Sequence, residues 1–191
     1  MKNLSFYTTL LLALFVIPSA IAQNKFALNL GFEGALPMSS GYKTMYMAAG
    51  GASIRAQYNV SDNIGVTLSS GALAFIPKEI GNLGGGGGNT PTKFNAMLSI
   101  PIKVGGKYYL TKGFYGMVEV GTVINRIISA NTSGGNPTVG LGGSFSALCY
   151  APGIGVQFGG FDLGVRYETF SKGGAESFMA ARLGFNLFSI K

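Results

Sequence analysis

Hydrophobic and polar residues alternate with a period of two along most of this chain. Between positions 25 and 36, Phe26, Leu28 and Leu30 occupy even positions, whereas Asn29 and Glu33 occupy odd ones. Successive side chains of a β-strand point to opposite faces, so this segment predicts a strand with one apolar and one polar face. The same pattern predicts seven further strands, at 46–58, 64–76, 94–110, 114–127, 144–158, 161–170 and 177–188.

The charged residues of the predicted strands follow the same alternation. Only Arg126, at the end of a strand, occupies an apolar position. In a soluble sandwich the apolar face would form the core, whereas in a membrane barrel it meets lipid and the charges point into the lumen. Five basic and four acidic residues occupy polar positions: Glu33, Arg55, Lys103, Lys107, Glu119, Asp162, Arg166, Glu168 and Arg182.

The connections between the predicted strands alternate in length. Segments 37–45, 77–93 and 129–143 are long, segment 171–176 is intermediate, and segments 59–63, 111–113 and 159–160 are short. Outer-membrane barrels combine short periplasmic turns with longer external loops, and closure of the sheet removes its unpaired edges. The chain therefore predicts an all-β fold, a closed antiparallel eight-stranded transmembrane up-and-down β-barrel with both termini on the periplasmic side.

Aromatic residues gather near the strand ends, which predicts two girdles at the membrane interfaces. The girdle beside the short turns comprises Phe26, Tyr58, Tyr108, Phe114, Phe158, Phe161 and Phe185. The girdle at the opposite ends comprises Tyr46, Phe75, Phe94, Tyr150, Phe170 and Phe178.

Two prolines lie inside predicted strands. Pro101 and Pro152 lack the N–H group that a ladder hydrogen bond needs, and a closed barrel offers no free edge for them. We therefore expect a bulge or a kink at each proline.

The first 22 residues have the pattern of a cleaved signal peptide. Lys2 precedes an apolar stretch at 10–17, and small residues at Ala20 and Ala22 form a cleavage site before Gln23. The apolar stretch is shorter than the roughly 20 residues that a membrane-spanning helix needs. The mature chain, residues 23–191, would form one outer-membrane barrel domain with 13 basic and 7 acidic residues.

The composition of the chain limits the kinds of binding site that it can form. The chain has no His and a single cysteine, Cys149, so we expect neither a metal site nor a cofactor. Cys149 occupies an inward position and is expected to fill space as a small buried residue. Basic residues are scattered rather than interleaved with aromatics on one surface, which argues against a nucleic-acid partner. The expected partners are outer-membrane lipid and lipopolysaccharide.

Three strand segments carry a resemblance to a known family. They are 98–110, which begins Leu98-Ser99-Ile100-Pro101, then 118–121 and 161–168. Together with the eight-strand pattern they make the chain resemble small outer-membrane β-barrels of the porin-like group, with OmpW-like and OmpA-like barrels as more distant relatives. The resemblance covers about residues 24–188 and implies residence in the outer membrane of a Gram-negative bacterium. The last strand resembles the aromatic-ended insertion signal of such barrels, although Ser189, Ile190 and Lys191 extend past Phe188.

Seven of the inward charges form the candidate site, a lumen charge network whose role has three interpretations. The network is a stabilising polar core, a narrow conduit, or a proton relay or catalytic group. Enzymatic barrels of this membrane resemble one another in using a His, which this chain lacks, so we expect no enzyme. The seven are Glu33, Arg55, Lys103, Glu119, Arg166, Glu168 and Arg182.

Three functions are compatible with this interpretation. The first is a non-catalytic structural or interaction role in the outer membrane, including that of an accessory subunit in an envelope complex. The second is a small porin or narrow conduit for hydrophobic or small solutes. The third is a surface adhesin that acts through its external loops.

Overall fold

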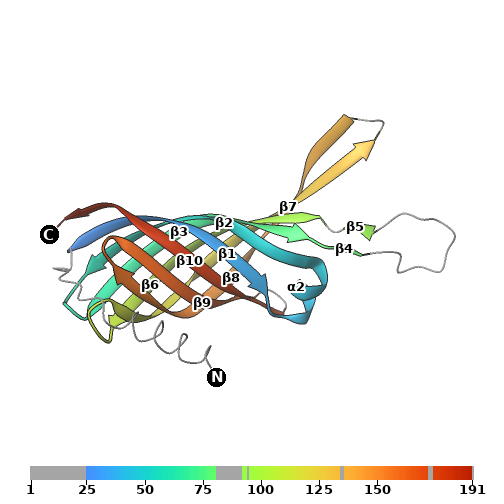
Figure 1. Ribbon diagram of the computed structural model, residues 1–191. Coiled ribbons are helices and arrows are strands. Elements are labelled where there is room, and N and C mark those ends of the chain that lie inside the picture. Colours follow the sequence, from blue (N-terminus) through green and yellow to red (C-terminus); the bar gives the residue numbers. More distant parts are fainter. Residues whose placement is uncertain (1–24, 81–91, 94, 134–135, 172–173, 191) are drawn as a thin grey trace, which may run out of the picture.

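The computed structural model describes residues 25–80, 92–93, 95–133, 136–171 and 174–190. The predicted signal peptide, residues 1–22, and Phe94 of the second predicted girdle lie outside these residues. Figure 1 shows the chain as a barrel with a short helix at one end. The elements are β1 (Phe26–Pro37), α2 (Ser40–Met45), β2 (Tyr46–Asn59), β3 (Ile64–Pro77), β4 (Glu79–Ile80), β5 (Thr92–Lys93), β6 (Ala96–Tyr109), β7 (Phe114–Ser133), β8 (Asn136–Phe158), β9 (Phe161–Ser171) and β10 (Ala175–Ile190).

Eight of the strands form a closed barrel in the order β1-β10-β9-β8-β7-β6-β3-β2. Every neighbouring pair is antiparallel, and β1 closes the barrel by pairing with β10 on one side and β2 on the other. The two-stranded β4–β5 sheet lies outside this ring. Phe26 pairs with Ile190, so the first and last strands begin and end at the same end of the barrel, beside the short turns. The predicted closed up-and-down barrel is confirmed.

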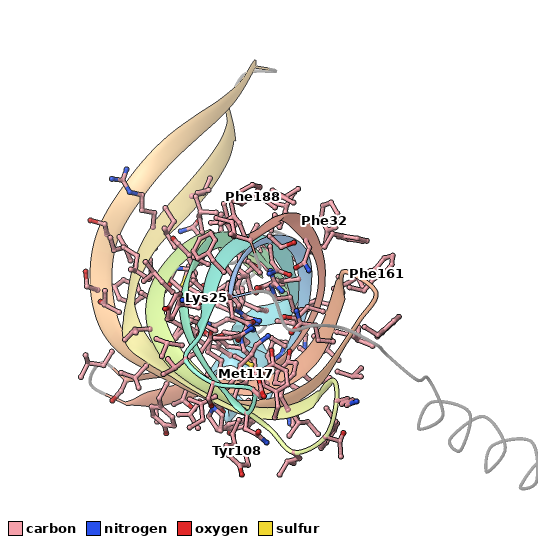
Figure 2. The ribbon with its side chains drawn as sticks, turned by 90° about the vertical axis from the view of Figure 1, so that its left-hand side faces the viewer. Lys25, Phe32, Tyr108, Met117, Phe161 and Phe188 are labelled. Atoms are coloured by element: carbon pink, nitrogen blue, oxygen red, sulfur yellow. The ribbon has the colours of Figure 1, made fainter. Side chains whose placement is uncertain are left out.

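The alternation of side chains separates two environments. Large apolar side chains cover the outer wall, among them Phe32 and Leu68, which are 61% and 58% exposed. Figure 2 shows the labelled side chains of Phe32, Tyr108 and Phe161 pointing away from the ribbon. The polar positions of the same strands point inward and are buried. Arg126, the predicted exception, is exposed on the outward parity.

The long connection predicted at 129–143 is the one that differs most from the structure. Residues 129–133 continue β7 and residues 136–143 belong to β8, and the two strands pair as far as Ser133 and Asn136, so the prediction of a loop over these residues is wrong. This extension projects beyond the barrel at the end that also carries α2 (Figure 1). Pairing of β6 begins at Ala96 opposite Ile128, and pairing of β9 ends at Ser171 opposite Leu148. The outer edges of the extension therefore have no strand neighbour among the described residues.

The two prolines interrupt ladders without shifting register. Pro101 pairs with Val123 of β7, and β3 resumes its register with β6 on both sides of the proline. Pro152 pairs with Val118 of β7 and leaves a gap in the ladder with β9. The predicted bulge is therefore wrong at both prolines, whereas the alternative of a kink stays a prediction. The fixed φ of proline suits an extended strand, and the missing N–H removes pairing with one neighbour only. Register shifts occur instead at 28–29, 46–48 and 126–128.

Two glycines of β7 allow a matched test of strand packing. A Cβ atom at Gly121 would lie 2.0 Å from the carbonyl oxygen of Ile102, whereas one at Gly116 would meet nothing within 4 Å. We expect Gly121→Ala to lower the free energy of unfolding by about 1–3 kcal/mol through overpacking, and Gly116→Ala to have little effect. Urea titration of the folded protein in lipid or detergent measures both. Equal unfolding midpoints for the two variants would contradict this packing.

Candidate functional site

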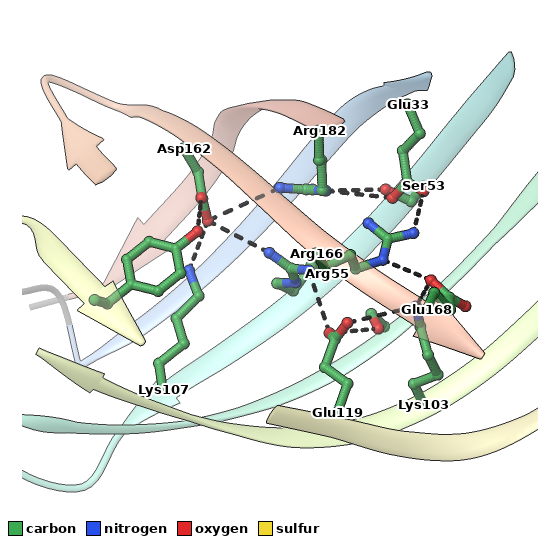
Figure 3. Close-up of polar contacts among 12 residues, drawn as sticks. Glu33, Ser53, Arg55, Lys103, Lys107, Glu119, Asp162, Arg166, Glu168 and Arg182 are labelled. Atoms are coloured by element: carbon green, nitrogen blue, oxygen red, sulfur yellow. Dashed lines mark hydrogen bonds and ion pairs between the residues drawn. The ribbon is translucent and has the colours of Figure 1, made fainter. Parts of the chain in front are cut away.

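A layer of charged side chains crosses the barrel lumen. It contains nine residues, contributed by the inward positions of six strands, and none of them is more than 8% exposed. Most of its ion pairs join strands that are not neighbours in the barrel, so the side chains reach across the lumen (Figure 3). The nine are Glu33 on β1, Arg55 on β2, Lys103 and Lys107 on β6, Glu119 on β7, Asp162, Arg166 and Glu168 on β9, and Arg182 on β10.

Arg166 is the best-paired cation of the layer. Its Nη2 atom lies 2.6 Å from Glu33 Oε2, and its Nε atom lies 2.6 Å from Glu168 Oε2. Lys103 Nζ lies 2.8 Å from Glu168 and 3.5 Å from Glu119. Charge-assisted hydrogen bonds of this length are the strong ones. Arg166 and Lys103 thus link three carboxylates from three strands.

Asp162 is the centre of a second group. Its carboxylate lies 2.6 Å from Lys107 Nζ, 3.6 Å from Arg55 Nη1 and 3.8 Å from Arg182 Nη1. Tyr115 donates its hydroxyl hydrogen to the same carboxylate, and Lys107 Nζ lies 4.0 Å from the centre of the Tyr115 ring. Arg55 also reaches Glu119 at 3.2 Å and so connects the two groups. The structure therefore brings all seven residues of the predicted lumen network together with Lys107 and Asp162.

Uncharged polar groups complete the layer. Ser69 donates to Glu119 at 2.9 Å, and Arg182 Nε donates to Ser53 at 2.9 Å. Ser53, Ser69 and Tyr115 were not predicted as members of the site. Their odd positions share the inward parity of Arg55, Thr67 and Glu119, so the alternation contained the signal.

An aromatic cluster occupies the lumen at the end that carries α2. Tyr42 of α2 packs edge-on against Tyr46 and Phe75, with ring centroids 5.4 Å apart in each pair. Phe178 packs against Phe75 at 5.4 Å and Phe170 at 5.0 Å. All five rings are buried, and burial raises the pKa of the Tyr42 hydroxyl, which keeps it neutral. We call these five residues the aromatic plug.

The aromatic plug corrects the second predicted girdle. Tyr46, Phe75, Phe170 and Phe178 point into the lumen, and only Tyr150 of the described members is exposed on the outer wall. The physical reason is side-chain parity: β3, β9 and β10 place Phe75, Phe170 and Phe178 on the same face as their inward polar residues. Tyr46 turns inward across the register shift at 46–48.

Hydrogen bonds fasten α2 over the plug. Glu176 of β10 accepts a hydrogen bond from the Ser39 hydroxyl and another from the Tyr42 backbone N–H at 3.1 Å. The Ser39 oxygen in turn accepts from the Ser177 N–H at 3.1 Å. These contacts join residues more than 130 positions apart in the chain and hold Tyr42 inside the barrel mouth.

The first predicted girdle lies beside the short turns. All seven of its residues are exposed or half-buried on the outer wall, and Phe161 contacts Phe158 and Phe185 with ring centroids 5.8 and 5.3 Å apart. Their role at a membrane interface stays a prediction. Cys149, on the inward parity, is buried within the core around the aromatic plug, as predicted.

The charge layer contains no unpaired carboxylate among the described residues. Each carboxylate faces at least one cation, an arrangement that lowers the cost of burying charge.

Within the described parts of the chain, no group of three or more His, Cys, Asp or Glu residues could hold a metal ion. No helix of the described residues is long and apolar enough to span a membrane.

Comparison with protein-family models and with curated protein sequences found no match. Among solved structures, the chain is similar to Ail, the attachment invasion locus protein of Yersinia pestis, with a TM-score of 0.56 and 14% identity over 86% of this chain and 97% of that chain. It is also similar to the N-terminal β-barrel domain of Pseudomonas aeruginosa OprF, with a TM-score of 0.55 and 14% identity over 86% of this chain and 100% of that chain. The chain has the fold of the small eight-stranded outer-membrane β-barrels.

Proposed function

We propose that this protein is a non-catalytic outer-membrane β-barrel with a structural or interaction role, including that of an accessory subunit in an envelope complex. The observation that carries the proposal is the separation of the two faces of the barrel wall, apolar outside and ion-paired inside. An apolar outer wall is stable against lipid, whereas in water it would be an exposed apolar patch of unusual size. Outer-membrane lipid and lipopolysaccharide are then its immediate partners.

The proposal includes an orientation. Short turns of outer-membrane barrels face the periplasm and longer connections face outward. The turns at 60–63, 110–113 and 159–160 therefore face the periplasm, and α2, β4–β5 and the β7–β8 extension face the exterior. Cleavage of residues 1–22 after export through the inner membrane belongs to the same proposal.

We expect the barrel to conduct neither ions nor solutes. The charge layer and the aromatic plug cross the lumen at two levels, and eight strands leave a lumen just wide enough for side chains to fill. We expect the purified protein to give no reproducible current steps in planar bilayers and no solute uptake into vesicles, while partners co-purify from envelope membranes. Reproducible single-channel currents would instead favour the small porin or conduit.

A specific feature favours adhesion as a second candidate. The β7–β8 extension projects from the exterior end with both outer edges unpaired among the described residues, and unpaired edges are sites where extended segments bind. The structural neighbour Ail bears the name attachment invasion locus protein and was also solved with the heparin analogue sucrose octasulfate, in a structure with a TM-score of 0.53 and 15% identity over 86% of this chain and 97% of that chain.

Two deletions test the adhesion candidate. One replaces residues 130–141 of the extension by a tight turn, and the other shortens the 82–90 segment as a matched control. If the protein is an adhesin that acts through the extension, binding of bacteria to host cells is lost only in the first variant. Equal binding by both variants and by the natural protein would exclude this role for the extension.

A further inference from the structure

A groove crosses the outer wall of the barrel. Its volume is about 910 Å³, near the upper end of the roughly 300–1,000 Å³ that small-molecule sites occupy. Five of the outward residues that line it form one rung of the ladder across five strands, because each pairs with the next. They are Ile64, Tyr108, Gly116, Ile154 and Val165. We call this hollow the wall groove.

Two glycines leave space for an occupant in the wall groove. A Cβ atom at Gly116 would meet nothing within 4 Å, and one at Gly106 would meet only the carbonyl oxygen of Gly65, at 4.0 Å. Beside them the exposed side chain of Tyr108 points away from the ribbon (Figure 2). A glycine inside a strand often marks a place where another molecule approaches the backbone closely. The two glycines therefore hold the groove open.

The wall groove runs from the end of the barrel with the short turns to about the middle of the wall. Ile64, at its first end, is the first residue of β3. Tyr167 and Met179 pair at its other end. They lie six positions along their strands from Phe161 and Phe185, a pair of the first girdle. Six residues of a tilted strand cover about 15 Å of depth, whereas the apolar band of such barrels is about 25 Å tall. The groove therefore has about the depth of one membrane leaflet.

The two ends of the wall groove differ in polarity. At the deep end, the hydroxyl of Tyr167 donates to Ser177 Oγ at 2.6 Å, so this polar group is satisfied and the ring lines the groove. At the shallow end, the turn between β6 and β7 carries Lys112, which is exposed and lies in the chain between Tyr108 and Gly116. A cation at the mouth of an apolar groove matches a phospholipid, in which an anionic headgroup is joined to hydrocarbon chains.

We propose that the wall groove binds one acyl chain of an anionic phospholipid of the periplasmic leaflet, with the headgroup phosphate at Lys112. The inference rests on the proposed outer-membrane orientation, which puts the short turns at the periplasmic interface. A second copy of the barrel matches the groove less well, because its convex wall cannot enter a hollow that follows the curvature of this one. A flexible hydrocarbon chain can follow that curvature.

Native mass spectrometry tests the groove with dioleoyl phosphatidylglycerol as the probe. The fraction of folded protein that keeps one lipid after removal of detergent is measured. Gly116→Leu fills the groove and is expected to lower this fraction about tenfold or more, since the loss of two buried methylene groups already has that effect. Gly34→Leu on β1 is the matched control and should keep the lipid, because a Cβ atom there also meets nothing within 4 Å and β1 does not line the groove. Gly106→Leu replaces Gly116→Leu if that variant does not fold.

Equal lipid retention by the groove variant and by Gly34→Leu would overturn the proposal. A dimer of the natural protein that Gly116→Leu dissociates would also overturn it and assign the groove to a second copy. Vesicle flotation separates these results from failure of the proposed function. A natural protein that does not float with phospholipid vesicles is no membrane barrel, whereas one that floats but retains lipid equally in all variants contradicts the groove alone.

Lys112→Gln tests the headgroup contact. The preference for phosphatidylglycerol over phosphatidylcholine in the same assay is expected to fall about fivefold, the effect of one cation near an anionic lipid surface. Lys25→Gln is the control, because Lys25 is exposed at the same end of the barrel, directly before β1, and the preference should persist there. An equal preference in both variants would overturn the assignment of the phosphate to Lys112.

Discussion

Replacing Arg166 by alanine is expected to lower the free energy of unfolding by about 3–5 kcal/mol. The guanidinium of Arg166 contacts Glu33 and Glu168 at 2.6 Å each, and both carboxylates are buried. Without Arg166, the nearest cation left to Glu33 is Arg182 at 3.8 Å, so a buried negative charge loses its close ion-pair partner. The midpoint of urea unfolding, or the temperature at which the folded form collapses in detergent, measures the loss.

Arg126→Ala is the matched control for that variant. Arg126 lies on β7 with an exposed side chain, and exposed substitutions usually change stability by about 0.5 kcal/mol or less. An Arg166→Ala midpoint equal to that of Arg126→Ala would show that the charge layer contributes nothing to stability, and the structural role proposed for it would be abandoned.

Replacing Phe178 by alanine is expected to cost about 3–5 kcal/mol, as large-to-small changes of buried aromatics do. Phe178 is 1% exposed and contacts the rings of Phe75 and Phe170 in the aromatic plug. Its removal leaves a cavity that the surrounding strands, fixed by their ladders, fill poorly. The same unfolding assay measures this effect.

Phe32→Ala provides the comparison for the plug. Phe32 is 61% exposed on the outer wall, where lipid or detergent replaces the lost ring. We expect a clearly smaller loss than for Phe178→Ala. If the two variants unfolded at the same urea concentration, the aromatic residues near α2 would behave as an outer girdle and not as a plug.

The alternation of side chains made most of the fold predictable. Within each strand the charged residues occupy the inward positions, as Glu119 does on β7 and Arg166 on β9. Placing an ionised group against apolar lipid would cost too much free energy. That constraint assigns the inward face of each strand from the order of residues alone. It also predicts that the charges meet, since an eight-stranded lumen is narrow. It does not predict which pairs form, because long side chains reach several partners across the lumen.

The second girdle was predicted wrongly because its residues were assigned from their position near the strand ends. Phe75, Phe170 and Phe178 lie near strand ends, where interfacial aromatics are expected, yet their parity is inward. Parity alone would have placed these three correctly. Tyr46 is different, because the register shift at 46–48 turns its side chain to the inner face of the wall. Nothing in the local sequence predicts that shift.

The composition of the chain did not predict the β7–β8 extension. Segment 129–143 is rich in glycine and polar residues, which favours a loop on average. Long-range pairing overrides that average, because β7 and β8 already lie side by side in the barrel and resume pairing at Ile128 and Leu141 after the register shift at 126–128. The prolines were misjudged for a related reason, since the neighbouring strands hold the register on both sides of each gap.

The central claim is that the apolar face of the barrel wall contacts lipid. The chain contains no Trp, so a single introduced Trp reports without background. Leu68→Trp and Val165→Trp place it on the outer wall at exposed positions, and Val60→Trp places it in a short turn as the control. In vesicles of lipids brominated along the acyl chains, we predict strong quenching of the indole fluorescence in the two outer-wall variants and little quenching in the control. Fluorescence that responds in all three variants to aqueous iodide and not to brominated lipid would contradict the account.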